Sequence, residues 1–319
     1  MHRIKRPTLA IVIPAYKATF LRAALDSIAA QTCKDFRLYI GDDCSPHDLD
    51  AIIDAYRDRI ALVYHRFDSN LGGSDLVAQW ERCIAMSKEE PYIWVFSDDD
   101  VMEPNCVEAL LKQIDETKGY YDLYHFDVNE INDKDEVTKS LPEYPQVLGA
   151  YDFYKGKSSG RYRSYVVENV FTRKVYELSG GFKNFDLAWG SDVATWCIFC
   201  GEKGMYKVPD AKVYWRRSGQ NITPDKTQQI SERKLMARCE SLTWAYSYFN
   251  CQPDIWNTNK YSFICVIRHY RKLVSNECLQ KAYKYFFNSH GYRNKMLQVR
   301  LITILPNRIF RLMNQFIKL

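Results

Sequence analysis

The chain has 319 residues, of which 46% are hydrophobic and 26% charged, with a formal net charge of +5. This composition is that of a globular protein with a core of ordinary size, in one large domain or two. No run approaches the eighteen or so apolar residues of a membrane span, and the apolar run at residues 9–13 is too short for a signal peptide. We therefore expect a cytoplasmic protein.

The charge distribution indicates the kind of partner, and the cysteine content indicates the state of the thiols. Residues 256–319 hold twelve Lys or Arg and one acid, Glu277, so this part carries +11 and the rest about −6. The basic part predicts an anionic partner, and the acidic body would carry carboxylate sites. Ten irregularly spaced cysteines do not predict a disulfide framework, and the Cys197/Cys200 pair lies in an apolar helical stretch that favours buried thiols.

Short apolar runs and segments with helical periodicity alternate along the first 100 residues. We expect strands at residues 9–14, 36–40, 60–65 and 92–96 and helices at residues 20–28, 49–56 and 76–86. This alternation predicts a doubly wound α/β sheet with right-handed crossovers. A dinucleotide-binding Rossmann domain is the competing interpretation, but no GxGxxG motif follows the first strand.

Three adjacent aspartates, residues 98–100, follow the strand expected at residues 92–96. Ligands of open α/β sheets bind at the carboxyl ends of strands, where the other strands deliver Tyr16 and Asp43. Mutual repulsion of the carboxylates would be relieved by Mg²⁺ or Mn²⁺, which complete their shells with phosphate oxygens. The alternative is a solvated turn that caps a helix beginning near Pro104.

The second half of the chain has a weaker pattern. A strand at residues 121–128 is followed by an acidic, Asn-rich stretch that we expect to be a solvated turn, and residues 141–163 give no clear prediction. Further on we expect a helix at residues 193–200, short strands at residues 204–207 and 213–216, and helices from about residue 228.

The order of motifs resembles the family 2 glycosyltransferases of the GT-A fold. The motifs are strand-Pro-Ala-Tyr, strand-Gly-Asp-Asp-Cys-Ser, Asn-Leu-Gly-Gly, strand-Ser-Asp-Asp-Asp, Gly-Gly-Phe, Trp-Gly-Ser-Asp and Val-Tyr-Trp-Arg, and they cover residues 8–223. The resemblance implies a Rossmann-like mixed sheet flanked by helices. It also implies an inverting, metal-dependent enzyme that transfers a sugar from a nucleoside diphosphate sugar to a hydroxyl.

By position in these motifs, the resemblance assigns donor-binding roles. Ala15 and Tyr16 would contact the base, usually uracil, and Asp43 would accept its imide N–H. Asp99 would bind the metal, and Asp98 would face the ribose or the metal. The chain has Ser-Asp-Asp-Asp where Asp-x-Asp-Asp is usual, which leaves open which neighbour of Asp99 touches the ribose.

Each of these residues has a structural alternative. Tyr16 could be a core aromatic, and Asp43 could begin the turn that contains Ser45. Gly72 and Gly73 would serve backbone conformation rather than phosphate binding.

Asp192 is the expected catalytic base. Inverting transfer is an in-line displacement, so a carboxylate must take the proton of the acceptor hydroxyl opposite the diphosphate. The resembling family has a Glu-Asp pair here, whereas this chain has Ser191 before Asp192. The alternative is that Ser191 or Asp192 only caps the helix. Arg216 or Arg217 would place a positive charge beside the diphosphate leaving group. The alternative is that these arginines are solvated at the surface.

We expect a GT-A domain at residues 1–225, with a nucleotide-sugar half at residues 1–118 and an acceptor half at residues 119–225, and a basic helical extension at residues 226–319. The last segment has an apolar stripe of Leu305, Ile309, Leu312, Met313 and Phe316 with Arg308, Arg311 and Lys318 near it. This amphipathic segment predicts binding to an anionic membrane surface, at the inner face of the membrane. Nucleic acid is not expected as a partner, because no recognition motif accompanies the basic residues. The alternative is a helix docked on the domain or a dimer contact.

The predicted function is an inverting transfer from a nucleotide sugar, UDP-linked, with Mg²⁺ or Mn²⁺, to a saccharide or lipid-linked saccharide in polysaccharide or glycan assembly. The alternative is a catalytically inactive protein of the same fold that binds nucleotide sugars or glycans. A nucleotide-sugar hydrolase or pyrophosphorylase would require other phosphate-binding motifs.

Overall fold

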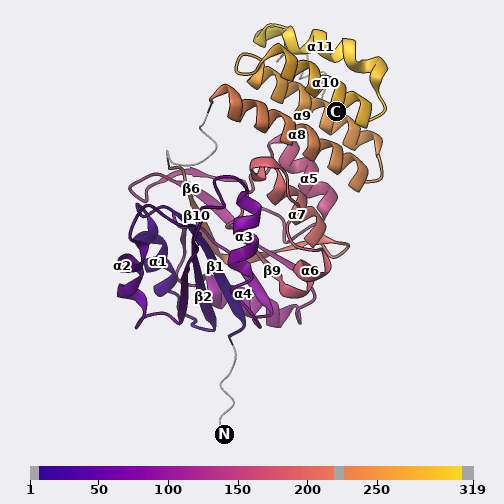
Figure 1. Ribbon diagram of the computed structural model, residues 1–319. Coiled ribbons are helices and arrows are strands. Elements are labelled where there is room, and N and C mark those ends of the chain that lie inside the picture. The colour runs from indigo at the N-terminus through magenta and orange to yellow at the C-terminus, as the bar shows by residue number, and fades with distance from the viewer. Residues whose placement is uncertain (1–6, 219–225, 311–319) are drawn as a thin grey trace.

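The structure, a computed structural model, describes residues 7–218 and 226–310. Its centre is a ten-stranded mixed sheet with helices on both faces, and stacked helices lie beyond it (Figure 1). The strands follow the order β3-β2-β1-β4-β9-β6-β10-β5, with β7 on β6 and β8 on β10. They are β1 Leu9–Ala15, β2 Phe36–Asp42, β3 Leu62–Arg66, β4 Tyr92–Val95, β5 Val101–Met102, β6 Leu123–Ile131, β7 Val137–Ser140, β8 Val147–Leu148, β9 Asn169–Thr172 and β10 Met205–Arg216.

The parallel part of the sheet brings three strand ends together. β1 pairs in parallel with β2 on one side and β4 on the other, so Ala15 lies opposite Asp42 and Val12 lies opposite Val95. Beyond β4 the sheet becomes mixed, because β9 runs antiparallel to both β4 and β6. The carboxyl ends of β1, β2 and β4 therefore share one edge, as the sequence predicts.

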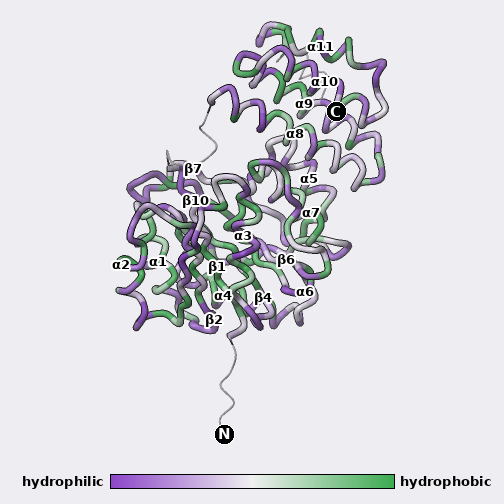
Figure 2. Tube along the Cα trace, viewed as in Figure 1, coloured by the Kyte–Doolittle hydropathy of each residue, from purple (hydrophilic) through white to green (hydrophobic). Residues whose placement is uncertain are grey.

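Seven helices accompany the sheet: α1 Leu21–Ala29, α2 Leu49–Ile53, α3 Leu76–Ile84, α4 Cys106–Glu116, α5 Ala150–Ser159, α6 Arg173–Leu178 and α7 Ser191–Cys200. Leu9, Ile11 and Ile13 of β1 pack with α1, α2 and α4, whereas Ala10 and Val12 pack with α3, α5 and α7. Because both faces of the strand are buried, its sequence is a continuous apolar run rather than an alternating one. Figure 2 shows hydrophobic residues along the central strands.

The second half of the chain differs from the sequence prediction. The Asn-rich stretch is not all solvated, since β6 extends to Ile131 and buries both Glu130 and Ile131. The region without a clear pattern contains β8 and α5. The two strands expected near the end are one strand, β10, whose pairing with β6 shifts between Val208 and Lys212. Asp210 has a φ of 63° at this shift, which is a β-bulge. The sequence around the bulge resembles that of a turn, so one strand was predicted as two.

The C-terminal helical extension is present, with α8 Gln228–Tyr248, α9 Pro253–Tyr270, α10 Asn276–Ser289 and α11 Met296–Ile304 (Figure 1). Its core is continuous with one face of the sheet, because Leu235 and Leu242 of α8 belong to the same buried cluster as Trp196 of α7. The division near residue 225 stays a prediction. Within residues 7–218 and 226–310, no helix is both long and apolar enough to cross a membrane.

Candidate functional site

Backbone hydrogen bonds join the ends of the three parallel strands. The N–H of Asp43, just after β2, donates to the carbonyl of Ala15 at 2.8 Å, and the N–H of Phe96 donates to the carbonyl of Val12 at 2.8 Å. Residues that follow β1, β2 and β4 are thus held side by side. The sequence prediction that Ala15, Asp43 and the aspartates share one edge is confirmed by this geometry.

Asp98 organises the segment that follows β1. Its Oδ2 accepts the backbone N–H of Tyr16 at 2.8 Å and that of Lys17 at 2.7 Å. The Tyr16 side chain is left at the surface, with the residue 43% exposed, so the core-aromatic alternative is wrong. An exposed ring above a buried strand end is available to stack on a flat ligand.

Lys17, which the sequence analysis did not select, lies between two of the aspartates. Its Nζ donates to Asp99 Oδ2 and is 3.3 Å from Asp98 Oδ1. The hydroxyl of Ser97 donates to Asp99 Oδ1, and that of Ser218 donates to Oδ2 at 3.2 Å. The only sequence signal for Lys17 is its place directly after the Ala-Tyr pair.

Burial dominates the electrostatics of this cluster. It raises the pKa of Asp98, while the Lys17 ammonium opposes the shift and the charge of Asp99 adds to it. Burial also raises the pKa of Asp100 well above its usual value, and Asp99 adds to that shift. Burial would lower the pKa of Lys17, but its ion pairs with Asp98 and Asp99 outweigh this and raise it. Three buried carboxylates in a row therefore favour a positive charge beside them.

The residues fit a divalent cation that is shared with a ligand. In the described parts of the chain, no group of three or more His, Cys, Asp or Glu side chains is arranged to hold a metal ion. Asp98 and Asp99 offer hard carboxylate oxygens, and Mg²⁺ commonly takes one or two carboxylates and completes its shell with water and phosphate. The Lys17 ammonium already lies against Asp99, so a positive charge is accommodated there.

Arg216 is buried, with 1% of its surface exposed, so the surface-solvation alternative is wrong for this residue. Its Nε donates to the carbonyl of Asp99 at 2.7 Å, Nη1 donates to the carbonyl of Asn132 at 2.6 Å, and Nη2 pairs with Asp135. Its backbone N–H donates to Asp100 Oδ1 at 2.6 Å. Arg216 therefore clamps the aspartate segment to the end of β10. Its contact with a donor stays a prediction.

Asp43 holds the Asn-Leu-Gly-Gly loop. Its Oδ1 accepts the N–H of Leu71 at 2.7 Å, and its Oδ2 accepts the N–H of Gly72 at 2.8 Å and Nδ2 of Asn70 at 2.9 Å. The Arg82 guanidinium of α3 pairs with Oδ1. Both carboxylate oxygens are therefore engaged, and the predicted contact with a base stays a prediction.

The structure decides two of the alternatives in this region. The N–H of Ser45 donates to Asp42 at 2.7 Å, so Asp42, rather than Asp43, begins that turn. Gly72 does not have a left-handed φ, but a Cβ there would lie 2.7 Å from Oδ2 of Asp43. The glycine is therefore needed for the close approach of the loop to the carboxylate.

Asp192 lies in the first turn of α7, and the N-cap position is occupied by Gly190 with a φ of 99°. The hydroxyl of Ser191 accepts the N–H of Phe185 at 2.9 Å, within the protein interior. The alternative that Ser191 or Asp192 is the N-cap of the helix is therefore wrong. A helix N-terminus with an acidic residue in its first turn also suits the helix dipole.

Asp192 retains partial exposure to solvent. Desolvation by the surrounding protein raises the pKa of the Asp192 carboxyl group, while the positive charges of Lys157 of α5 and Arg238 of α8 oppose the shift. The contacts of the described residues do not join Asp192 to the aspartates after β4. Its role as the base stays a prediction.

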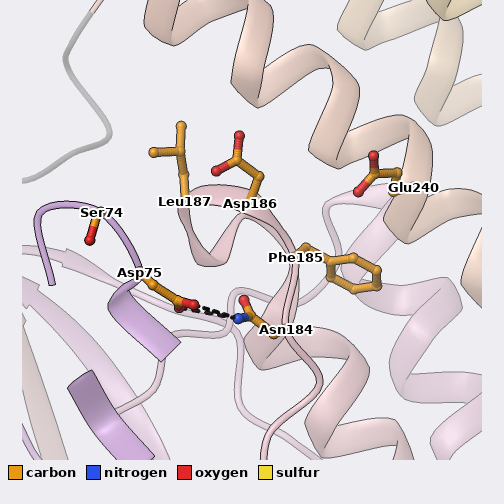
Figure 3. A pocket seen from close by; sticks show the side chains of 7 residues that line it. All are labelled: Ser74, Asp75, Asn184, Phe185, Asp186, Leu187 and Glu240. Atoms are coloured by element: carbon orange, nitrogen blue, oxygen red, sulfur yellow. Dashed lines mark hydrogen bonds between the residues drawn. The ribbon is translucent and has the colours of Figure 1, made fainter. Parts of the chain in front are cut away.

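A polar cavity of about 280 Å³ lies beside the loop that leads to Asp192 (Figure 3). Its walls come from the start of α3, the loop before α7, and α8, and Asn184 Nδ2 donates to both carboxylate oxygens of Asp75 at 3.1 Å. Leu187 and Ala188 have left-handed φ values of 57° and 54°. The lining residues are Ser74, Asp75, Asn184, Phe185, Asp186, Leu187 and Glu240.

Solved structures show which fold this is. The fold is similar to residues 1–349 of S. aureus TarS in complex with UDP-GlcNAc, with a TM-score of 0.57 and 13% identity over 91% of this chain and 92% of that chain. It is also similar to a longer S. aureus TarS structure, with a TM-score of 0.57 and 13% identity over 93% of this chain and 54% of that chain. The fold is the GT-A fold of glycosyltransferases.

The family follows from the sequence. The profile of glycosyl transferase family 2 matches residues 10–171, about half of the chain, and the chain belongs to this family. Uncharacterized glycosyltransferases of Rickettsia prowazekii (strain Madrid E) and Rickettsia typhi (strain ATCC VR-144 / Wilmington) are each 32% identical to it, over 33% and 32% of this chain. The chain spans about a third of the length of these relatives, 31% and 30%.

Proposed function

We propose that the protein is an inverting glycosyltransferase that moves a sugar from a UDP-linked donor to an acceptor hydroxyl. The observation that carries the proposal is the convergence of an exposed Tyr16 with buried Asp98 and Asp99 at one sheet edge. The S. aureus TarS structures with UDP-GlcNAc and UDP, which have a similar fold, support UDP as the nucleotide.

The donor would lie across the ends of β1, β2 and β4. Tyr16 would stack on the base, Ala15 would contact it through its backbone, and Asp43 would hold the adjoining loop and face the imide N–H. Asp99, with Asp98, would hold Mg²⁺ or Mn²⁺, whose charge offsets that of the diphosphate leaving group. Arg216 would keep the aspartate segment in place.

Asp192 would act on the acceptor. The acceptor oxygen attacks the anomeric carbon, the bond from that carbon to the diphosphate oxygen breaks, and the hydroxyl proton passes to the carboxylate of Asp192. General-base assistance of this kind contributes about 10²–10⁴-fold. The polar cavity beside the loop before α7 would receive the acceptor sugar, because carboxylate and amide groups suit its hydroxyls.

We further propose that the acceptor is a saccharide or lipid-linked saccharide of polysaccharide or glycan assembly, reached at the cytoplasmic face of a membrane. Exposed Leu297, Leu301 and Ile304 on α11, in the strongly basic C-terminal part, support contact with an anionic surface. Leu305 and Ile309 of the predicted apolar stripe are described, while Leu312, Met313 and Phe316 lie outside the described residues.

Asp99→Asn and Asp192→Asn test the reaction. With UDP-GlcNAc and Mn²⁺, we expect release of UDP to fall in both variants, by about 10²–10⁴-fold for Asp192→Asn. Isothermal titration with UDP and Mn²⁺ should show weakened binding in Asp99→Asn and unchanged binding in Asp192→Asn. Binding of the nucleotide by the wild-type protein without any turnover of a panel of UDP-sugars would contradict the proposal and indicate a binding protein.

A further inference from the structure

The turn between β6 and β7 lies close to the aspartate segment that follows β4, because sheet pairing brings the two together. Tyr214 of β10 pairs antiparallel with Val101 of β5. Two residues further along β10, Arg216 pairs in parallel with Ile131 at the end of β6. Arg216 therefore lies between the aspartate segment on one side and the β6–β7 turn, residues 132–136, on the other.

The Asn132 side chain closes this turn. Its Oδ1 accepts the N–H groups of Lys134 and Glu136 at 2.9 and 3.1 Å, and its Nδ2 donates to Glu136 Oε2 at 2.8 Å. Asp135 has a left-handed φ of 63° in the turn, a conformation that Asp and Asn adopt more readily than most residues with a side chain. The turn is thus fixed by its own hydrogen bonds, and it holds the Asp135 carboxylate at a defined place.

The Arg216 guanidinium joins this turn to two segments at the carboxyl ends of the parallel strands. Nη1 donates to the carbonyl of Asn132 at 2.6 Å, and Nη2 pairs with the Asp135 carboxylate. Nε donates to the carbonyl of Asp99 at 2.7 Å. The guanidinium carbon also lies 4.4 Å from the centre of the Phe20 ring, in the segment after β1. One cation therefore connects the β6–β7 turn with the residues that follow β1 and β4.

The ion pair between Arg216 and Asp135 is buried at one end and exposed at the other. The Arg216 side chain is 0% exposed, whereas the Asp135 side chain is 62% exposed. A buried guanidinium cannot turn towards water, so the direction of its N–H groups depends on the acceptors around it. Removing the charge of Asp135 weakens one of the acceptors that set the direction of Nε.

We propose that Asp135 is a positioning residue for Asp99, acting through Arg216. The Asp135 charge fixes the guanidinium, and Nε then fixes the carbonyl of Asp99. The backbone N–H of Arg216 fixes the adjacent Asp100, whose Oδ1 it reaches at 2.6 Å. The inference rests on the proposed role of Asp99 in holding the metal ion. A turn outside the motifs of the donor site thereby sets the geometry of that site.

Hydrogen exchange in the full chain, followed by NMR, tests the contact without any ligand. Asp135→Asn removes the charge and keeps a residue that tolerates the left-handed backbone. The amide of Arg216, which donates to Asp100, should then exchange about three- to tenfold faster than in the wild-type protein. This range lies between the effect of an exposed ion pair and that of a hydrogen bond to a buried charged group. An unchanged rate would overturn the inference.

Asp133→Asn is the matched control. Asp133 is an exposed residue of the same turn, and it has no hydrogen bond or ion pair with the residues that the structure describes. Its substitution should leave the exchange rate of the Arg216 amide as in the wild-type protein, and an equal acceleration in both variants would overturn the inference. Should Asp135→Asn not fold, Asp135→Gly, which also accommodates a left-handed φ, replaces it with the same expected result.

Binding of UDP with Mn²⁺ tests the consequence for Asp99. Isothermal titration should show binding about three- to tenfold weaker in Asp135→Asn and unchanged in Asp133→Asn. Uridine, which carries no phosphate for a metal ion to contact, should bind equally to the wild-type protein and to both variants. Equal weakening for uridine and for UDP with Mn²⁺ would show a general loss of structure and overturn the inference.

Failure of the proposed function would give a different result. A wild-type protein that binds neither UDP nor uridine would contradict the proposed function, and the exchange rate of the Arg216 amide would still decide whether Asp135 holds the aspartate segment. Accelerated exchange in Asp135→Asn together with unchanged binding of UDP and Mn²⁺ would overturn the positioning of Asp99 alone.

Discussion

At the residue scale, Asp99 is the point where two kinds of positive charge would compete. Its Oδ2 is bonded to the Lys17 ammonium, and its Oδ1 to the Ser97 hydroxyl. A divalent cation bound to Asp99 would need the oxygens that Lys17 and Ser97 contact. Oδ2 of Asp98 is already engaged by the backbone N–H groups of Tyr16 and Lys17. Lys17 would then be released towards the negative diphosphate as the ion and donor enter together.

Lys17→Met should therefore bind Mn²⁺ more tightly than the wild-type protein when no nucleotide is present. A hydrogen bond to a charged group contributes about 1.5–3 kcal/mol, so a gain of roughly tenfold or more is expected. Electron paramagnetic resonance of free Mn²⁺ measures the binding directly. Lys112→Met, an exposed lysine on α4, is the control and should leave the affinity unchanged. Equal or weaker binding in Lys17→Met would contradict the competition.

At the scale of elements, α11 exposes one apolar face. Leu297, Leu301 and Ile304 are 69%, 56% and 65% exposed, and their spacing of four and three residues places them on one side of the helix. The end of the helix is anchored on α9, because Arg268 donates to the carbonyls of Thr303 and Leu305 at 3.1 and 2.8 Å. The exposed row is thus held in place by α9, and the described residues leave it uncovered.

Leu297→Ser combined with Leu301→Ser should weaken binding to vesicles that contain an anionic lipid. Burying one leucine contributes about 2 kcal/mol, so the two substitutions should reduce binding at least about tenfold. Co-sedimentation with phosphatidylglycerol vesicles measures the effect.

Val137→Ser on β7, where Val137 is 51% exposed, is the control and should bind as the wild-type protein does. Unchanged binding of the α11 variant would exclude the membrane as its partner. A change in oligomeric state would instead identify this face as a contact between copies of the chain.

At the scale of the whole molecule, a buried polar chain ties the sheet domain to the extension. The Tyr154 hydroxyl of α5 donates to Asn259 Oδ1 of α9, and the Asn259 amide lies 3.3 Å from Nε2 of His290 after α10. His290 Nδ1 lies 2.7 Å from the carbonyl of Phe286. His290 is 3% exposed, and burial lowers its pKa to about 4.

The neutral state of His290 makes the stability of the extension dependent on pH. Between about pH 6.5 and pH 4 the unfolded chain binds a proton on this histidine and the folded chain does not. As the pH is lowered through this range, the free energy of unfolding therefore decreases by at most about 3 kcal/mol. In His290→Gln this contribution is absent. Urea unfolding at pH 7, 6 and 5 should show the stability advantage of the wild type shrinking as pH falls, whereas a constant difference would contradict a neutral buried imidazole.

The edge at the carboxyl ends of β1, β2 and β4 could be predicted from sequence because its signals are local. A strand that is buried on both faces has a continuous apolar run, and the polar residues that follow it, such as Tyr16, Asp43 and Asp98, must lie at its carboxyl end. Three such runs in alternation with helices place their ends along one edge. The C-terminal helices follow from the same kind of periodicity.

The partners of these residues depend on the tertiary structure. Lys17 meets Asp99 and Arg216 meets the aspartate segment only because strands far apart in the chain lie side by side in the sheet. A residue's type and its local spacing state what chemistry it can perform. Which charge it meets, and whether water reaches it, is set by sheet pairing and burial, because electrostatic and packing energies depend on distance in space rather than along the chain.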